Sequence, residues 1–266
     1  MTKHSVLSWS VLVCSTMAPA LVYATPRDLI DDLYHADISS PNEELSSSLD
    51  GELGILLSSG NTSANSIKAG INAHHDTENW SNRYTAELLY KQSVVSEGNK
   101  QTTAHRFFGT GQFDYKLGRK DRRLFVYGDY ENDRFNGYDH RASLAVGWSQ
   151  RLWRDNMSAF RYSVGPGYSF VKPLESNNVN IGDSVIVRAS AEYEYKWESG
   201  ARLRQFLSTE AGEFNTKSRS ETSVSANVFG EMAMKFSVVL NHDSDTPEDV
   251  ASLNTETSVA LVYQFF

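Results

Sequence analysis

Charged residues recur at every second position along several segments of this chain. Successive side chains of a β-strand point to opposite faces, so charges two residues apart share one face. Inside a closed sheet such a face forms a charged lumen, which orients and sorts solutes by charge. Two sets of residues are expected there: a basic wall of Arg141, Arg151, Arg161, Arg188, Arg202 and Arg204, and an acidic wall of Asp50, Glu52, Glu87, Asp114, Asp129 and Glu131.

Two interpretations of these charges stay open. In the first the lumen conducts, and its arginine wall favours small anionic or zwitterionic solutes. In the second the charges pair with one another, and long arginines seal the interior. The further charges available for pairing are Glu192, Glu194, Lys196, Lys68, Lys91 and Lys116.

Catalysis and metal binding have weaker support. His140 and Ser143 are three residues apart, which puts them on opposite faces of a strand and argues against a lipase. His242, Asp243 and Asp245 share a loop, but no opposing acidic pair suggests a protease. That loop lacks the glycine of a calcium loop, although divalent ions could bridge it to lipopolysaccharide. No catalytic residue, metal site or cofactor is predicted, and a lipid or peptide hydrolase at the rim is kept as an alternative.

The elements that must position these charges are strands. From Val185 to Trp197 an apolar or aromatic residue alternates with a polar or charged one, a pattern that no helix keeps over this length. Such segments are long for a soluble sheet and suit tilted strands that cross a membrane. We expect twelve, at 49–57, 66–76, 80–93, 102–117, 124–132, 140–152, 157–170, 184–198, 201–208, 222–229, 232–241 and 254–266.

The connections between these strands alternate in length. Those after odd strands run 7 to 13 residues and those after even strands 2 to 6. Outer-membrane barrels have long outer loops and short periplasmic turns, and an even strand count puts both ends on the periplasmic side. A sandwich would alternate too, but in lipid only closure pairs every backbone group. We therefore predict an all-β, transmembrane, antiparallel up-and-down β-barrel of about twelve strands.

Aromatic residues mark the ends of the expected strands. Tyr263, Phe265 and Phe266 end the last strand and resemble the signal that the outer-membrane insertion machinery reads. Other rings are expected to form interfacial girdles, and stacking on sugars inside a channel is the alternative. These rings are Trp80, Trp148, Trp153, Trp197, Tyr84, Tyr195 and Phe160.

Composition excludes other classes. The mean hydropathy of -0.44 over 266 residues argues against a polytopic helical membrane protein, and one cysteine rules out a disulfide scaffold. The formal charge of -8 argues against nucleic acid as a partner.

The first 48 residues are expected to form two segments outside the barrel. Lys3 and an apolar stretch to Val22 predict a signal peptide over residues 1–24, cleaved after Ala24. Cleavage at Ala18-Pro19-Ala20 and a retained anchor helix are the alternatives. Residues 25–48 are expected to form a periplasmic lead or small plug, and residues 49–266 the barrel.

Several short motifs carry a family resemblance. They are Gly51-Glu52-Leu53-Gly54, Ser59-Gly60-Asn61-Thr62, the segment Asp133 to Asp139, Gly165-Pro166-Gly167-Tyr168, His242-Asp243-Ser244-Asp245-Thr246-Pro247, Thr255-Glu256-Thr257 and Tyr263-Gln264-Phe265. In this order they resemble the family of domain of unknown function 481, whose members are often called salt-induced outer-membrane proteins. The extra Phe266 departs from the family's single final phenylalanine.

The resemblance covers residues 49–266 and implies a barrel in the outer membrane of a Gram-negative bacterium, without established catalytic residues. We expect a non-catalytic narrow channel for small polar solutes or an envelope-stress component, with a sealed structural barrel as the alternative. The expected partners are outer-membrane lipid and lipopolysaccharide, the insertion machinery and periplasmic chaperones.

Overall fold

The structure is a computed structural model that describes residues 46–59, 64–95, 99–118, 121–133, 138–173, 182–246 and 251–265. The expected signal peptide, nearly all of the expected lead and Phe266 lie outside these described residues. The same holds for the loop motifs around Asn61, Arg134 and Pro247. Within the described part of the chain, no helix is long and apolar enough to cross a membrane.

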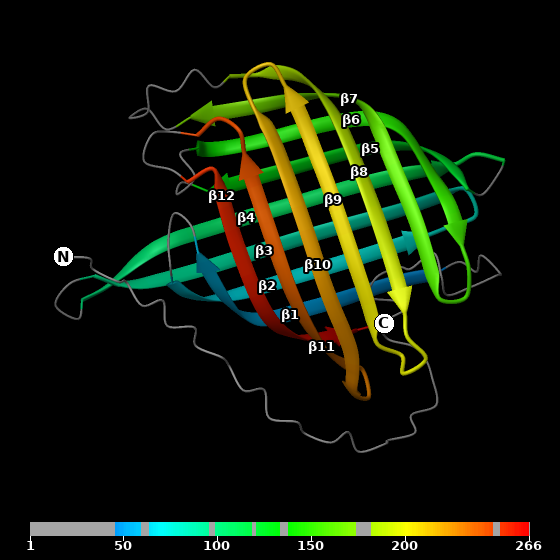
Figure 1. The fold of residues 1–266 in the computed structure, drawn as a ribbon, viewed down its shortest axis with the longest axis horizontal. Helices are drawn as coiled ribbons and strands as arrows, with labels where there is room; N and C mark the ends of the chain where they lie inside the picture. The colour runs from blue at the N-terminus through cyan, green and yellow to red at the C-terminus, as the bar shows by residue number, and fades with distance from the viewer. Residues whose placement is uncertain are drawn as a thin grey trace, which may run out of the picture.

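Twelve antiparallel strands, each hydrogen-bonded to its neighbours in chain order, close into one barrel (Figure 1). The closing pair is β1 with β12, where Glu52 lies opposite Val262. The predicted antiparallel up-and-down barrel is therefore confirmed. The strands are β1 (Ser46–Ser59), β2 (Ala64–Asp76), β3 (Trp80–Val95), β4 (Asn99–Lys116), β5 (Arg122–Asp133), β6 (Tyr138–Arg154), β7 (Ser158–Pro173), β8 (Ser184–Lys196), β9 (Arg202–Gly212), β10 (Thr216–Phe229), β11 (Met232–Asp243) and β12 (Leu253–Gln264).

The predicted alternation of long and short connections is only partly right. Strands β9 and β10 are joined through residues 213–215, whereas the sequence pattern suggested a loop over 209–221. Lys217 pairs with Glu210 and Thr216 with Ala211, so the backbone ladder continues through this polar segment. The longer connections that remain are 174–183 and 244–252. The loop prediction over 209–221 was wrong because the alternating apolar side chains stop before the hydrogen-bonded strands end.

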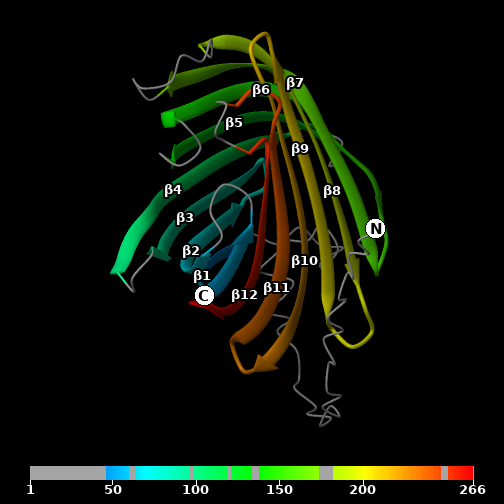
Figure 2. The same cartoon turned by 60° about the vertical axis from the view of Figure 1, so that its left-hand side comes forward.

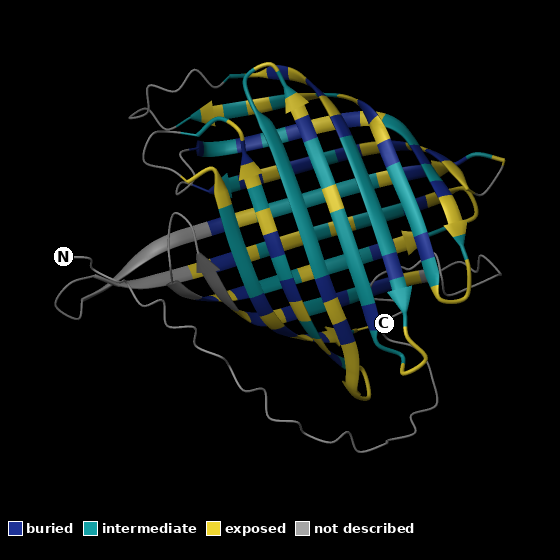
Figure 3. Cartoon of the chain, in the orientation of Figure 1, coloured by how far each residue is buried: buried dark blue, intermediate teal, exposed yellow. Residues whose placement is uncertain are grey.

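The two faces of the sheet have opposite chemistry. Large apolar side chains point outward, with Val185 at 69% and Leu53 at 63% exposure, while Asp50 and Asp114 are fully buried inside. Buried and exposed residues alternate along the strands in Figure 3. A water-soluble domain would place its apolar side chains inside. An apolar outside around a charged inside is typical of a transmembrane barrel.

Exposed aromatic side chains occur near both ends of the barrel, and several ring pairs lie at the end where odd strands begin. Trp80 contacts Tyr115 at 5.0 Å between ring centroids, and Trp153 stacks on Phe160 at 4.8 Å. Tyr263 and Phe265 meet edge to face at 5.2 Å, and both are exposed. These ring pairs lie where odd strands begin and even strands end, as a girdle requires.

In Figure 2, β8 to β11 curve side by side along one wall and β2 to β6 form the opposite wall.

The end of the barrel where odd strands begin also carries the short turns after even strands. In the turn between β6 and β7, the Asp155 carboxylate accepts hydrogen bonds from the backbone N–H groups of Met157 and Ser158 and from the Ser158 hydroxyl. These bonds hold the pKa of Asp155 below its usual value, the Met157 N–H having the largest effect.

Strands β6 and β7 approach each other closely at a pair of glycines. A Cβ atom on Gly165 would lie 2.6 Å from the Cα of Gly147, and closer still to the carbonyl oxygen of Val146. A Cβ on Gly147 would also meet the Phe125 ring at 2.9 Å. Both positions therefore need glycine, because the neighbouring backbone occupies the space of a side chain.

We predict that Gly165→Ala destabilises the folded barrel by about 1–3 kcal/mol, because the added methyl group overpacks the β6–β7 contact. The measurement is a urea titration of protein folded into lipid vesicles, with the heat-modifiable gel shift as a second readout. Gly70→Ala is the matched control, since its new Cβ would meet nothing closer than 3.6 Å. Equal unfolding midpoints for the two variants would contradict the interpretation.

Candidate functional site

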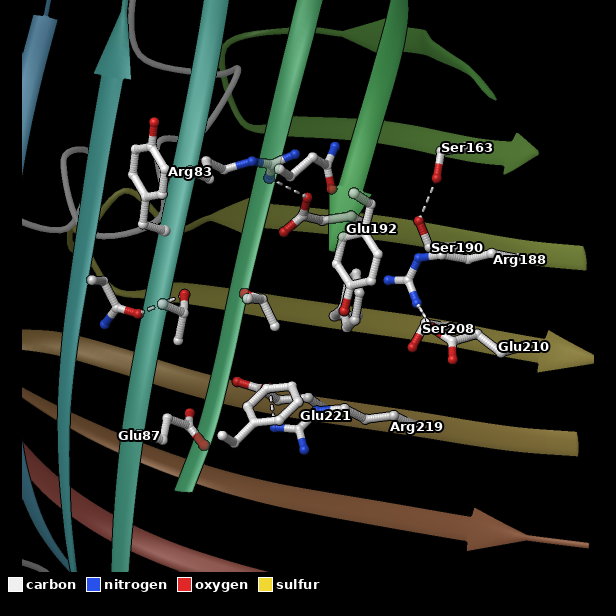
Figure 4. Close-up of a pocket in the computed structure, with 18 of the residues that line it drawn as sticks. Arg83, Glu87, Ser163, Arg188, Ser190, Glu192, Ser208, Glu210, Arg219 and Glu221 are labelled. Carbon is white, nitrogen blue, oxygen red and sulfur yellow. Dashed lines mark hydrogen bonds and ion pairs between the residues drawn. The ribbon is translucent and has the colours of Figure 1, made fainter. Parts of the chain in front are cut away.

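The barrel interior contains a cavity of about 220 Å³, lined by residues from β1 to β11. Its wall carries nine basic and six acidic side chains, so the electrostatics of the site depend on how these pair. Figure 4 shows part of the wall, where charged side chains reach inward from strands on different sides.

All twelve residues of the two predicted walls face the barrel interior, but they do not form one site. Seven line the cavity: Glu52, Glu87, Glu131, Arg141, Arg161, Arg188 and Arg204. The other five are buried elsewhere in the interior: Asp50, Asp114, Asp129, Arg151 and Arg202. Arg151, for example, donates to Asp121 at 3.0 Å, in the turn before β5.

One ion pair in the cavity wall crosses the lumen. The Nη1 of Arg83, on β3, lies 3.2 Å from Oε2 of Glu192, on β8 (Figure 4). Glu192 also accepts from Nε of Arg204 at 2.6 Å, while Arg83 lies 3.5 Å from Asp114. These residues lie toward the girdle end, and we call Arg83, Glu192 and Arg204 the floor cluster.

A second group of ion pairs crosses the lumen toward the other end. Arg106 contacts Glu131 at 2.9 Å and Glu256, on β12, at 2.7 Å. Arg141 contacts Glu131 at 2.6 Å and Asp243, on β11, at 2.9 Å. We call Arg106, Glu131, Arg141, Asp243 and Glu256 the roof cluster.

Charges of both signs therefore occur on both sides of the lumen. The sequence had predicted a basic wall opposite an acidic wall. Arg83 and Arg106 stand on the side assigned to acids, and Glu192 and Glu210 on the side assigned to bases. Glu210, Lys217, Arg219 and Glu221 were missed because their segment looked like a loop. Asp243 was expected in an outer loop, but it is the buried last residue of β11.

Pairing explains how so many charges can be buried. An ion taken out of water costs several kcal/mol unless a partner and further hydrogen bonds compensate it. Arg188 forms an ion pair with Glu210, and its guanidinium lies 3.6 Å from the centroid of the Tyr127 ring. Lys68 lies 3.0 Å from Glu87, and Lys235 lies 3.0 Å from Glu52. Lys91 is one of the six further charges that the sequence made available for pairing, and its side chain lies outside the described residues.

The candidate catalytic groups do not meet. The Ser143 hydroxyl is inside and hydrogen-bonds to Asp129 and Glu210, whereas His140 stacks on the exposed ring of Tyr130. Among the described residues, no three His, Cys, Asp or Glu side chains are placed to hold a metal ion. The groups that the described part of the site presents are charge pairs and hydroxyls.

Comparisons with known proteins agree on the family. A family model described as "Protein of unknown function, DUF481" matches residues 51–265. The chain is also similar to the uncharacterized protein YdiY of Escherichia coli (strain K12). They are 24% identical over 211 residues, which is 79% of this chain and 80% of that protein.

Two solved structures with some likeness are described as outer-membrane channels. The COG4313 outer membrane channel from Pseudomonas putida F1 has a TM-score of 0.47 at 9% identity, covering 86% of this chain and 100% of that one. The outer membrane channel DcaP of Acinetobacter baumannii has a TM-score of 0.41 at 7% identity, with coverages of 84% and 96%.

We predict that Glu131→Gln lowers the free energy of unfolding by about 3–5 kcal/mol, because it leaves Arg106 and Arg141 buried with one shared partner fewer. Asp139→Asn is the control, since Asp139 pairs with the exposed Lys172, and we expect a change within about 1 kcal/mol. Urea unfolding in lipid vesicles, followed by tryptophan fluorescence, measures both. A Glu131→Gln variant as stable as the control would show that the roof cluster contributes little.

Proposed function

The chain belongs to the DUF481 family, and from its ion-paired lumen we propose that it is a non-catalytic outer-membrane barrel through which small polar solutes pass. The observation that carries this proposal is the cavity of about 220 Å³ inside a closed barrel, walled by charged and polar side chains. Lumens of this chemistry favour polar solutes over apolar ones.

The outer surface of the barrel supports the proposal that the protein lies in a lipid bilayer. Every strand has at least 11 residues, which is enough for a tilted strand to cross the hydrocarbon core. Leu53, Ile55, Val185 and Val187 are more than half exposed, and water would not favour such a surface on a monomer. Bacterial outer-membrane barrels have their short turns in the periplasm, so we expect the turns after even strands on that side.

The floor and roof clusters make the pathway narrow. The floor cluster joins β3 to β8, and the roof cluster joins β4 to β12 and β6 to β11. A solute must pass these pairs, so we propose that they act as constrictions on either side of the cavity. The anionic or zwitterionic preference expected from the sequence remains untested, and the pairing of the lumen arginines with carboxylates argues against it.

A sealed structural barrel is the second candidate. The observation that favours it is the completeness of the pairing, since the lumen is crossed by ion pairs near both ends of the cavity. An envelope-stress role, which the family resemblance implies, fits either candidate and is kept as part of the proposal.

We predict that Arg83→Gln increases single-channel conductance in planar lipid bilayers, because it removes the pair that crosses the lumen at the floor. The variant should still fold, since Glu192 keeps Arg204 at 2.6 Å and Asp114 keeps Arg123 at 3.8 Å. Lys172→Gln, which neutralises a 63% exposed side chain, is the control and should conduct as the unaltered protein does.

The recordings separate the two candidates. Current through the unaltered protein that rises in Arg83→Gln supports the conduit. If the unaltered protein and Arg83→Gln both fold, as judged by the heat-modifiable gel shift, and both are electrically silent, the conduit is refuted and the sealed barrel stands.

A further inference from the structure

Uncharged hydroxyl and amide side chains form two rows on the wall of the cavity. Four serines lie side by side in register across β6 to β9, and we call them the serine rung: Ser149, Ser163, Ser190 and Ser208. Asn72, Thr85 and Thr110 lie side by side across β2 to β4 and form the second rung. All seven line the cavity.

The rungs lie between the two charged clusters. Arg83 is two residues before Thr85 on β3, and Glu192 is two residues after Ser190 on β8, so the floor pair joins the strands just beneath the rungs. Arg106 precedes Thr110 on β4, on the roof side. Because serine is small, the serine rung leaves space where arginine or glutamate would fill the lumen. The cavity is therefore bounded by charges and lined between them by hydroxyls.

The hydroxyls have hydrogen-bonding capacity that the protein does not use. Ser190 and Ser208 line the cavity and are half-buried, so a solute can reach their hydroxyls. Ser163 and Ser190 share one bond of 2.7 Å (Figure 4), although each hydroxyl can donate once and accept twice. A ligand that supplies further hydrogen-bond partners to these hydroxyls gains affinity.

The charges of the cavity, by contrast, are already compensated. Arg106, Arg141 and Arg204 each contact two carboxylates at 3.5 Å or less. A charged ligand would have to displace one of these partners and leave it buried without compensation. A neutral ligand would leave the pairs intact.

Two phenylalanine rings complete the wall. Phe108 and Phe206 line the cavity, and the guanidinium of Arg204 lies 5.1 Å from the Phe206 ring centroid. An aromatic ring offers an apolar surface beside polar groups. A monosaccharide has the matching chemistry, with hydroxyls around its rim and an apolar face of C–H groups. The cavity is also smaller than sites for drug-sized ligands, which run from about 300 Å³ upward.

We infer that the lumen contains a binding subsite for a neutral, polyhydroxylated solute of monosaccharide size, held by the serine rung and the Asn72–Thr85–Thr110 rung. This inference deepens the proposed function, on which it rests, by naming the class of polar solute that passes. The floor and roof clusters then select against charged solutes of the same size.

The test uses full-length protein folded in an amine-oxide detergent, because sugar-headed detergents would compete for the site. Saturation-transfer NMR with D-glucose is the binding measurement, with D-glucuronate and D-glucosamine as charged probes of similar size. We expect transfer to glucose and at most weak transfer to the two charged sugars.

The matched variants remove hydroxyls inside and outside the site. Ser190→Ala combined with Ser208→Ala should weaken glucose binding about tenfold, the loss of one to two hydrogen bonds. Ser225→Ala is the control and should bind as the unaltered protein does, because Ser225 is buried in the barrel interior but does not line the cavity.

The outcomes separate the subsite from the conduit. No transfer to glucose, equal transfer to all three sugars, or equal losses in the double variant and in Ser225→Ala each overturn the subsite. Bilayer current without glucose binding refutes the subsite and leaves the conduit standing. Glucose binding that the double variant abolishes, in a protein without current, supports the subsite and refutes the conduit.

Discussion

The compensation of buried charge across the lumen is the constraint on which the rest of this structure depends. A closed barrel with an apolar outside has no place for its charges except inside, where each must find a partner. Neighbouring strands supply some partners, as Arg188 and Glu210 do on β8 and β9. Others come from across the barrel, as with Arg83 and Glu192 or Arg141 and Asp243. These transverse pairs bring the walls together and set the limits of the cavity.

Along each strand, the hydrogen-bonded backbone ladder and the band of lipid-facing apolar side chains end at different residues. Apolar side chains on the outside occupy a band, whereas the hydrogen-bonded ladder extends beyond it, as the pairing of Lys217 with Glu210 shows. Ladder pairing needs only extended backbone, while the apolar band has to match the thickness of the hydrocarbon. The strands are therefore longer than the alternation of apolar residues, and four charged residues of the lumen wall lie in the extension: Glu210, Lys217, Arg219 and Glu221.

Side-chain size then decides where the lumen is filled and where it is open. Arginine and glutamate reach the centre and meet, which closes the interior at the floor and roof clusters. Serine does not reach the centre, so the serine rung leaves a hollow between them. The hollow is polar without free charge, because its hydroxyls are neutral and its charged neighbours are paired. Under the proposed function, a hollow of this design favours neutral solutes that match its hydrogen-bonding groups and its size.

Much of this architecture could be predicted from the sequence. The alternation from Val185 to Trp197 assigned each residue of β8 to a face, because the side-chain period of a strand is two. The same rule placed all twelve predicted charges inside, and it located twelve strands. What it could not supply was the partner of each charge: nothing local links Arg106 to Glu256, which are 150 residues apart, or marks Ser149 as a member of a rung. Those relations depend on register and closure, since the register of β6 to β9 aligns the four serines and closure brings β3 opposite β8. The sequence by itself thus determined which side chains face inward, and the tertiary structure decided which of them meet, because facing is a local property of the backbone and pairing is a property of the closed sheet.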